Sequence, residues 1–289
     1  MKIVHTVKEL RSTLDALRQG GRTVGLVPTM GALHEGHASL VRRSVAENDV
    51  TVVSVFVNPT QFNDPNDLRL YPRNLEADCR LLAGVGAAVV FAPTPEEAYP
   101  EPDTRQFSYA PLDTVMEGAH RPGHFNGVCQ VVSRLFAFAQ PTRAYFGEKD
   151  YQQLAIVRAM VHDLGFPLDI VACPIVREAD GLALSSRNAR LTAEQRVQAV
   201  AISRALRNSL AYARTHTVAQ TRDHVVADIA AAPGLRLEYY EIVDGDTLQT
   251  IERWTDARRV AVGCITVWCG DVRLIDNIKY EPLTDANAL

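Results

Sequence analysis

Residues 23–37 read TVGLVPTMGALHEGH, and they place a short apolar run directly before a glycine-containing turn and a helix-like segment. A continuous apolar stretch such as 23–29 is typical of a strand that is buried on both faces. The helix that we expect over 35–48 carries Leu40 and Val41 on one side. A strand, a turn and a helix in this order begin a βαβ unit, and such units build parallel sheets.

Strand-like and helix-like segments continue to alternate as far as residue 176. We expect strands at 50–57, 87–92, 144–146 and 168–176, and helices at 75–83, 128–138 and 152–164. Residues 93–102 are rich in proline and glutamate and are predicted to form a loop. The alternation predicts an α/β fold, with a Rossmann-like parallel sheet in an N-terminal domain over 1–176.

The pattern changes after residue 176. Two long helices are expected at 192–215 and 218–231, followed by strands of a mixed or antiparallel sheet at 237–243, 259–267 and 271–274. These segments predict a smaller α+β domain over 177–289, in which residues 280–289 form a tail.

The composition restricts the class of protein. The chain has 289 residues, with 30 Lys+Arg against 34 Asp+Glu, a formal net charge of −4 and a pI near 6.1. This mild acidity is unlike the basic excess of a nucleic-acid-binding surface, and no apolar stretch reaches the roughly 18–20 residues that span a bilayer. The N-terminal residues lack the apolar core of a signal peptide, and the five cysteines are odd in number and widely spaced. We therefore expect a cytoplasmic protein with reduced cysteines and neither a nucleic-acid nor a membrane partner.

The decapeptide at 28–37, PTMGALHEGH, carries the most informative chemistry. It follows a strand and opens a helix, where backbone N–H groups and the helix dipole favour an anion. His34 and His37 are three residues apart, so both imidazoles project to the same side of a helical first turn and can donate to a polyphosphate. One alternative is a zinc site, although the segment is one residue short of HExxH, and another is a pair of surface histidines.

Two further polar stretches follow predicted strands. In NPTQF, Asn58 and Gln61 offer amide groups that suit hydroxyl and carboxylate ligands, and the alternative is a plain turn. In GEKDYQQ, Lys149 suits a phosphate and Asp150 suits ribose hydroxyls, and the alternative is a helix-capping turn.

Three other stretches carry candidate groups. In GLALSSRN, Ser185, Ser186 and Arg187 can hold a phosphate through hydroxyls and a guanidinium, unless the stretch is only a polar linker between domains. Asp78 lies where a helix begins and is a candidate carboxylate for the magnesium side of a site. The stretch EGAHRPGHFNGV is expected to be a Gly/Pro-rich loop that flanks a pocket, and its polar side chains include His120, Arg121, His124 and Asn126.

Together these blocks resemble the pantoate–β-alanine ligase family, which is part of the His-x-Gly-His nucleotidyltransferase superfamily. The resemblance runs in order through PTMGALHEGH, NPTQF, YPR, RPGHFNGV, GEKDYQQL and IVREADGLALSSRN, from residue 24 to near residue 190. The C-terminal third is similar in character more than in motif.

The resemblance implies an enzyme that condenses (R)-pantoate with β-alanine to pantothenate, a step toward coenzyme A. Pantoate would attack the α-phosphate of ATP to give pantoyl adenylate and pyrophosphate, and the amine of β-alanine would then displace AMP. Magnesium would accompany ATP and be held largely by its phosphates, with no tightly bound organic cofactor. The family also implies a cytoplasmic homodimer.

The resemblance further assigns roles to particular residues. His37 would be the proton donor, and His34, Lys149 and Arg187 would be further catalytic residues. Gln61 and Gln153 would hold pantoate, and Gln61 would also serve β-alanine. To these the residue patterns add Asn58 as a substrate contact and Asp78 as a carboxylate near the metal. The implied ATP-binding residues are Met30, Gly31, Ala32, Leu33, His34, Glu35, Gly36, His37, Gly147, Glu148, Lys149, Asp150, Val176, Leu184, Ser185, Ser186 and Arg187.

Three alternative functions are compatible with the residues alone. Another His-x-Gly-His nucleotidyltransferase would need extra cationic side chains for a phosphate substrate, whereas Gln61 and Gln153 suit a small hydroxy acid. A nucleotide-binding sensor would bind ATP without releasing pyrophosphate. A metal-dependent hydrolase would contain a metal ion in the purified protein.

Overall fold

The structure is a computed structural model, and it describes residues 1–63 and 65–282. Over these residues the chain forms two compact units. Unit 1 is made of Met1–Asp113, Gly118–Glu148 and Gln153–Pro174. Unit 2 is made of Thr114–Glu117, Lys149–Gln152 and the described residues from Ile175 onward. Most of the tail predicted at 280–289 lies outside the described residues.

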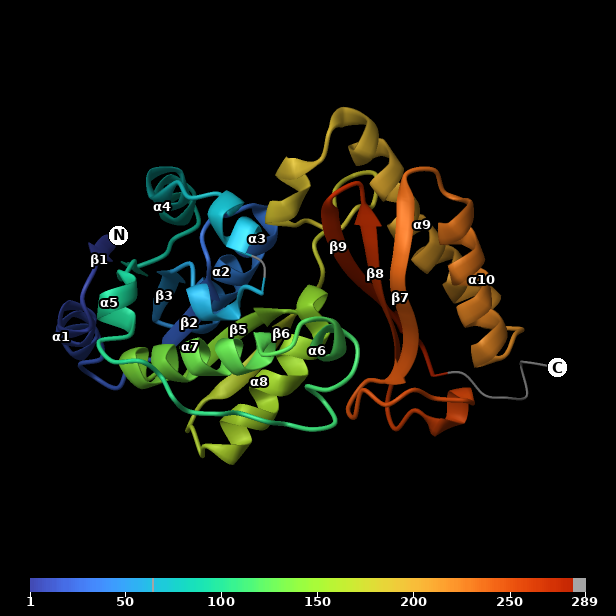
Figure 1. The fold of residues 1–289 in the computed structure, drawn as a ribbon. Coiled ribbons are helices and arrows are strands. Elements are labelled where there is room, and N and C mark those ends of the chain that lie inside the picture. Colours follow the sequence, from blue (N-terminus) through green and yellow to red (C-terminus); the bar gives the residue numbers. More distant parts are fainter. Residues whose placement is uncertain (64, 283–289) are drawn as a thin grey trace. The chain divides into compact units, whose positions relative to one another are not determined.

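Six parallel strands form the sheet of unit 1, in the order β1-β4-β3-β2-β5-β6 (Figure 1). The strands are β1 (Lys2–Val4), β2 (Val24–Thr29), β3 (Val50–Val55), β4 (Val89–Phe91), β5 (Arg143–Gly147) and β6 (Asp169–Cys173). The central strands are apolar on both faces because helices cover both, as in other parallel sheets. The predicted α/β class and its parallel sheet are therefore confirmed.

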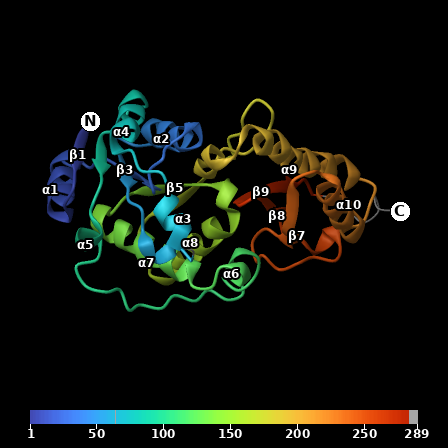
Figure 2. The same cartoon turned by 45° about the horizontal axis from the view of Figure 1, so that its top comes forward.

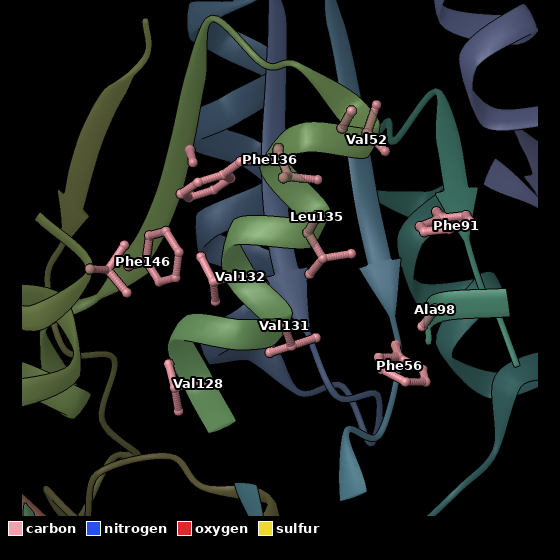
Figure 3. Close-up of a cluster of buried hydrophobic side chains, with 14 of the residues drawn as sticks. Val52, Phe56, Phe91, Ala98, Val128, Val131, Val132, Leu135, Phe136 and Phe146 are labelled. Carbon is pink, nitrogen blue, oxygen red and sulfur yellow. The ribbon is translucent and has the colours of Figure 1, made fainter. Parts of the chain in front are cut away.

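Helices from different parts of the chain cover the two faces of this sheet. Side chains of α1 (Val7–Leu17), α7 (His124–Ala139) and α8 (Tyr151–Asp163) join one buried cluster with the strands, and those of α2 (Glu35–Glu47) and α4 (Leu75–Gly84) join another. Figure 3 shows the first cluster, in which α7 presents residues spaced three and four apart to the sheet, as an amphipathic helix does. These α7 residues are Val128, Val131, Val132, Leu135 and Phe136.

The strand order changes direction beside β2. The chain passes from β2 outward through β3 and β4, and then returns to place β5 on the other side of β2. Such a switch point leaves a crevice at the carboxyl ends of the strands, which is where open α/β sheets bind ligands. The segments that leave these ends are those that follow Thr29 and Gly147.

Unit 2 contains an antiparallel sheet of β7 (Leu235–Asp244), β8 (Ala261–Cys269) and β9 (Val272–Tyr280). Two helices, α9 (Ala193–Tyr212) and α10 (Val218–Ala231), lie beside this sheet in both views (Figures 1 and 2) and share its apolar core. Ser209 and Tyr280 contribute a buried hydroxyl pair to that core, 2.8 Å apart. The predicted helices and strands of this region are present, and β9 extends beyond the predicted strand at 271–274.

Short helices depart from the sequence-based expectations. The predicted loop at 93–102 contains α5 (Pro95–Ala98), which begins with a proline and is capped by the Thr94 side chain, whose hydroxyl accepts the N–H of Glu97. The predicted loop at 117–128 contains α6 (Glu117–His120) and the start of α7, so His124 and Asn126 are helical. A further helix, α3 (Pro65–Leu70), and the N-terminal β1 and α1 lie where no element is predicted from the sequence.

Candidate active site

The loop between β2 and α2 is held by a carboxylate from α4. Gly31 and Ala32 both adopt left-handed backbone conformations, with φ of +78° and +50°. Asp78 is buried, and its oxygens accept the N–H groups of Ala32 at 3.1 Å and Leu33 at 2.8 Å. Burial raises the pKa of Asp78, and the two N–H donors oppose that rise. Both carboxylate oxygens therefore hold the turn, and a contact of Asp78 with magnesium stays a prediction.

The two predicted histidines lie together at the start of α2. His34 is the N-cap, and its Nδ1 accepts the N–H of Gly36 at 3.1 Å. The Nδ1 of His37 accepts the N–H of His34 at 3.3 Å, and the two ring centroids are 4.1 Å apart. Because Nδ1 is an acceptor in both rings, the neutral imidazoles carry their protons on Nε2. The pair thus offers two Nε2–H donors beside a helix N-terminus, an arrangement that suits phosphate oxygens.

Close packing of α2 on β2 fixes where this N-terminus lies. A Cβ on Gly25 in β2 would overlap the side chains of Ser44 and Asn48, so the helix approaches the strand at its glycine. The hydroxyl of Ser44 also bonds Thr51 in the neighbouring strand at 2.8 Å. These contacts seat α2 over the sheet and place its first turn at the carboxyl end of β2.

The segment after β3 forms a tight amide network. Asn58 is buried, and its Nδ2 donates to the carbonyl of Gly127 at 3.1 Å and to Gln61 Oε1 at 3.3 Å. The hydroxyl of Tyr99 donates to Asn58 Oδ1 at 2.9 Å. Protein groups thus engage both ends of the Asn58 amide, which makes it a support for the turn. The Nε2 of Gln61 contacts Met30 Sδ at 2.9 Å, so Gln61 lies against the loop after β2.

Helix α7 supports the same turn through its first residues. The Nδ1 of His124 donates to the carbonyl of Gln61 at 2.8 Å, and His124 is itself buried. A Cβ on Gly127 would collide with the carbonyl of Thr60, so only glycine allows this approach of helix and turn. His124 therefore serves the predicted site through the Gln61 backbone, a role that the expected loop at 117–128 did not suggest.

The GEKDYQQ stretch is divided between the two units. Gly147 ends β5, next to β2 in the sheet, and with Glu148 it belongs to unit 1. Lys149 and Asp150 complete the short 3-10 helix η2 (Glu148–Asp150) and belong to unit 2. Gln153 lies half-buried in the first turns of α8, in unit 1. The roles of these residues toward ATP and pantoate stay predictions.

The remaining predicted ATP residues form a hairpin in unit 2. The carbonyl of Val176 accepts the N–H of Leu184 at 3.0 Å, and Arg177 pairs with Ala183 in an antiparallel bridge. Ser185 then caps the 3-10 helix η3 (Ser186–Arg190), and its hydroxyl accepts the N–H of Arg187 at 3.3 Å. The hairpin therefore brings Val176 and Leu184 together, and the role of both residues toward ATP stays a prediction.

A buried charge network in unit 2 has no counterpart among the predicted residues. The guanidinium of Arg273 on β9 donates to both oxygens of Glu117 at 2.7 Å and, through Nε, to Glu238 at 2.9 Å. Tyr239 and Thr266 donate to Glu117 as well, at 2.8 and 3.1 Å. Burial, reinforced by the adjacent Glu117 charge, raises the pKa of Tyr239 well above its usual range. Because Glu117 and Arg273 are far apart in sequence, no local pattern could reveal the pair.

Among residues 1–63 and 65–282, no cluster of three or more His, Cys, Asp or Glu side chains could hold a metal ion. In the same residues, no helix is long and apolar enough to cross a membrane. All five cysteines are unpaired, and four of them are buried.

A parallel α/β sheet with a helix N-terminus at its switch point is typical of the class of proteins that bind nucleotide phosphates, and here two imidazoles lie at that N-terminus. Within this class, the family profile described as pantoate-beta-alanine ligase matches residues 2–279. The chain belongs to the pantoate–β-alanine ligase family. It is an ATP-using ligase that condenses pantoate with β-alanine, which favours the ligase over the three alternative functions.

Similar proteins match along almost the whole chain. A pantothenate synthetase of Phocaeicola vulgatus is 71% identical over 97% of this chain and 100% of its own length. The crystal structure of pantothenate synthetase from Thermus thermophilus is 48% identical, with a TM-score of 0.92 over 98% of this chain and 100% of that one. A Francisella tularensis pantoate-beta-alanine ligase, crystallised with beta-gamma ATP and beta-alanine, is 34% identical, with a TM-score of 0.81 over 96% and 97%.

Proposed function

We propose that the enzyme works in two steps on ATP with its magnesium ion. In the first step, a carboxylate oxygen of (R)-pantoate forms a bond to the α-phosphorus of ATP, and the bond to pyrophosphate breaks. In the second step, the amine of β-alanine forms a bond to the acyl carbon, AMP leaves, and the amine gives up a proton. Neither step requires a covalent enzyme intermediate, so positioning and charge stabilisation suffice.

The observation that carries this proposal is the geometry of His34 and His37. Their Nε2–H groups stand beside the N-terminus of α2, where the backbone also favours negative charge. Negative charge grows on the α-phosphate and on the leaving pyrophosphate during the first step. His37 donates a proton to these phosphate groups, as the family resemblance implies, and its main effect is to stabilise their growing negative charge.

Other residues complete the proposed site. Lys149 and Arg187 neutralise phosphate charge, and Asp150 contacts the ribose. Gln61 and Gln153 hold pantoate, Gln61 also serves β-alanine, and Asp78 lies near the magnesium ion. Residues 1–176 act as the ATP- and pantoate-binding domain, and residues 177–289 close over the reactants. The working enzyme is a cytoplasmic homodimer.

The first test is exchange of labelled pyrophosphate into ATP with magnesium and pantoate but without β-alanine. Exchange that depends on pantoate is the expected result, because only a reversible adenylate step returns label to ATP. Addition of β-alanine should then yield pantothenate and AMP. A folded enzyme that forms pantothenate but gives no exchange would contradict the two-step route.

The histidines need variants that preserve the helix start. His37→Gln keeps an acceptor at the third helical position, and His34→Asn keeps an N-cap, so both retain the capping contacts of α2. Each should reduce the exchange rate roughly 10²-fold or more while the unfolding midpoint stays near that of the wild type. A variant within a few-fold of the wild type would remove that imidazole from the chemistry.

A further inference from the structure

An ion pair between Arg177 and Asp276 on β9 lies next to two stretches of the proposed site, the turn at Lys149 and the hairpin at 181–184. Arg177 follows β6, and its guanidinium donates to both oxygens of Asp276, at 2.6 and 2.9 Å. The side chains are 21% and 3% exposed, so the pair is largely shielded from water. A bidentate pair of this kind fixes the orientation of both groups as well as their distance.

The next residue on β9 extends this pair to Lys149. Asn277 is buried, and its backbone N–H donates to Asp276 Oδ1 at 2.8 Å while its carbonyl accepts from Arg177 at 3.2 Å. The side-chain Nδ2 of Asn277 then donates to the carbonyl of Lys149 at 3.0 Å. The backbone of a proposed phosphate-binding residue is thus tied to β9 by one amide group.

Arg177 makes a second connection, to the hairpin that leads into η3. Its guanidinium donates to the carbonyl of Gly181 at 3.2 Å, and the N–H of Glu178 donates to the carbonyl of Leu182 at 2.9 Å. The hairpin closes with the bond from Leu184 to Val176. Ser185 and the following residues therefore start from a backbone that the same ion pair holds.

We propose that Asn277 is a positioning residue for ATP, acting with the Arg177–Asp276 pair. The three residues hold Lys149 and the hairpin at 181–184 in one fixed arrangement within unit 2, so that the groups on both stretches meet the phosphates together. Preset geometry of this kind saves the cost of ordering each group when the ligand binds. The inference rests on the proposed roles of Lys149 and of Ser185, Ser186 and Arg187.

The test compares Asn277→Ala with a matched control in the same unit. Ser209 lies on α9, and Ser209→Ala also removes buried hydrogen bonds, namely those to Tyr280 on β9 and to the carbonyl of Leu206, neither of which is a proposed site residue. We expect Asn277→Ala to raise the KM for ATP about tenfold, the usual effect of one buried hydrogen bond, and the KM for pantoate less than about twofold. Ser209→Ala should lower the unfolding midpoint without changing either KM.

A double variant shows whether Asn277 acts through Lys149. In a Lys149→Ala background, Asn277→Ala should change the KM for ATP less than about twofold, because the group that it positions is gone. If Asn277→Ala itself does not fold, Asn277→Ser keeps a shorter donor and should give an intermediate KM for ATP.

Three results would overturn the inference, and they are distinguishable. An unchanged KM for ATP with a lower unfolding midpoint makes Asn277 a purely structural residue. A tenfold effect that persists in the Lys149→Ala background means that Asn277 acts elsewhere. If Lys149→Ala alone leaves turnover and the KM for ATP unchanged, the proposed site assignment fails first, and the positioning role fails with it.

Discussion

Replacing Asp78 tests whether one carboxylate holds the turn that precedes the histidine pair. In Asp78→Ala the N–H groups of Ala32 and Leu33 lose their acceptors, which lie at 3.1 and 2.8 Å. Each bond to a charged acceptor is worth roughly 1.5–3 kcal/mol. Removing the buried charge returns part of that free energy, since burial raises the pKa of Asp78. We expect a net cost of about 2–4 kcal/mol.

The cost should appear first as lost activity, because the turn can detach without global unfolding. A cost of about 2–4 kcal/mol shifts the equilibrium between the native and the detached turn by roughly 30-fold to 10³-fold, and this factor is the upper limit of the fall in kcat/KM for ATP, reached when the detached turn becomes the major state. The measurements are kcat/KM for ATP and the free energy of unfolding in urea, on the same preparations.

Asp78→Asn is the matched control. Its carbonyl oxygen can still accept from Leu33, whereas its NH₂ group opposes the N–H of Ala32, so about half of the cost should remain. If Asp78 contacts magnesium, as predicted from the sequence, excess magnesium should restore part of the lost rate in Asp78→Asn. A value of kcat/KM for ATP within about twofold of the wild type, together with an unchanged free energy of unfolding in Asp78→Ala, would refute the idea that this carboxylate holds the turn.

Three further predictions concern other parts of the chain. Hydrogen bonds from Arg105, and then from Arg134, hold the pKa of Asp103 well below its usual range; its contribution to stability is therefore present above about pH 4 and is lost as the pH falls. Asp103→Asn should thus lower the free energy of unfolding in urea at pH 7 by about 1–3 kcal/mol, and the loss should shrink progressively below about pH 4, with most of it still present near pH 3. A loss that does not shrink as the pH falls below about 4 would contradict the ion-pair explanation. Gln153→Ala should raise the KM for pantoate and leave the KM for ATP nearly unchanged in initial-rate assays, whereas an unchanged KM for pantoate would reject that contact. Because burial raises the pKa of the Cys129 thiol to about 12, a thiol reagent at pH 8 should label it only after denaturation.

Much of the fold could be predicted because its signals are local. The strand at β2, the turn after it and the start of α2 follow from an apolar run, breakers and histidines within fifteen residues. The start of α7 could not be predicted from the sequence, because Pro122 and Gly123 indicate a loop. In the structure Gly123 is instead the N-cap of that helix, with a left-handed φ of +81°. His124 is therefore buried beneath Gln61 and not exposed in a loop.

In the candidate site, too, contacts between residues close in sequence could be predicted, and contacts between residues remote in sequence could not. His34 and His37 lie three residues apart, and their proximity follows from helix geometry alone. The contact of Asn277 with Lys149 joins a strand to a turn that is remote in sequence, and depends on how unit 2 folds. No spacing rule could predict it, since only tertiary packing brings such residues together.

The way unit 2 is assembled limits how the protein can be divided. The chain passes between the units after Asp113, Glu117, Glu148, Gln152 and Pro174. A fragment that begins at residue 175 would keep the Arg273–Glu238 pair but lose Glu117, the other carboxylate on this buried guanidinium, and with it two charge-assisted hydrogen bonds worth roughly 1.5–3 kcal/mol each. Split reporters, truncation libraries and recombination between relatives should therefore keep residues 114–117 and 149–152 with the C-terminal part. The two structural units do not correspond to two continuous segments of the chain, so the crossover points of chimaeras should be chosen from the units and not from position in the sequence.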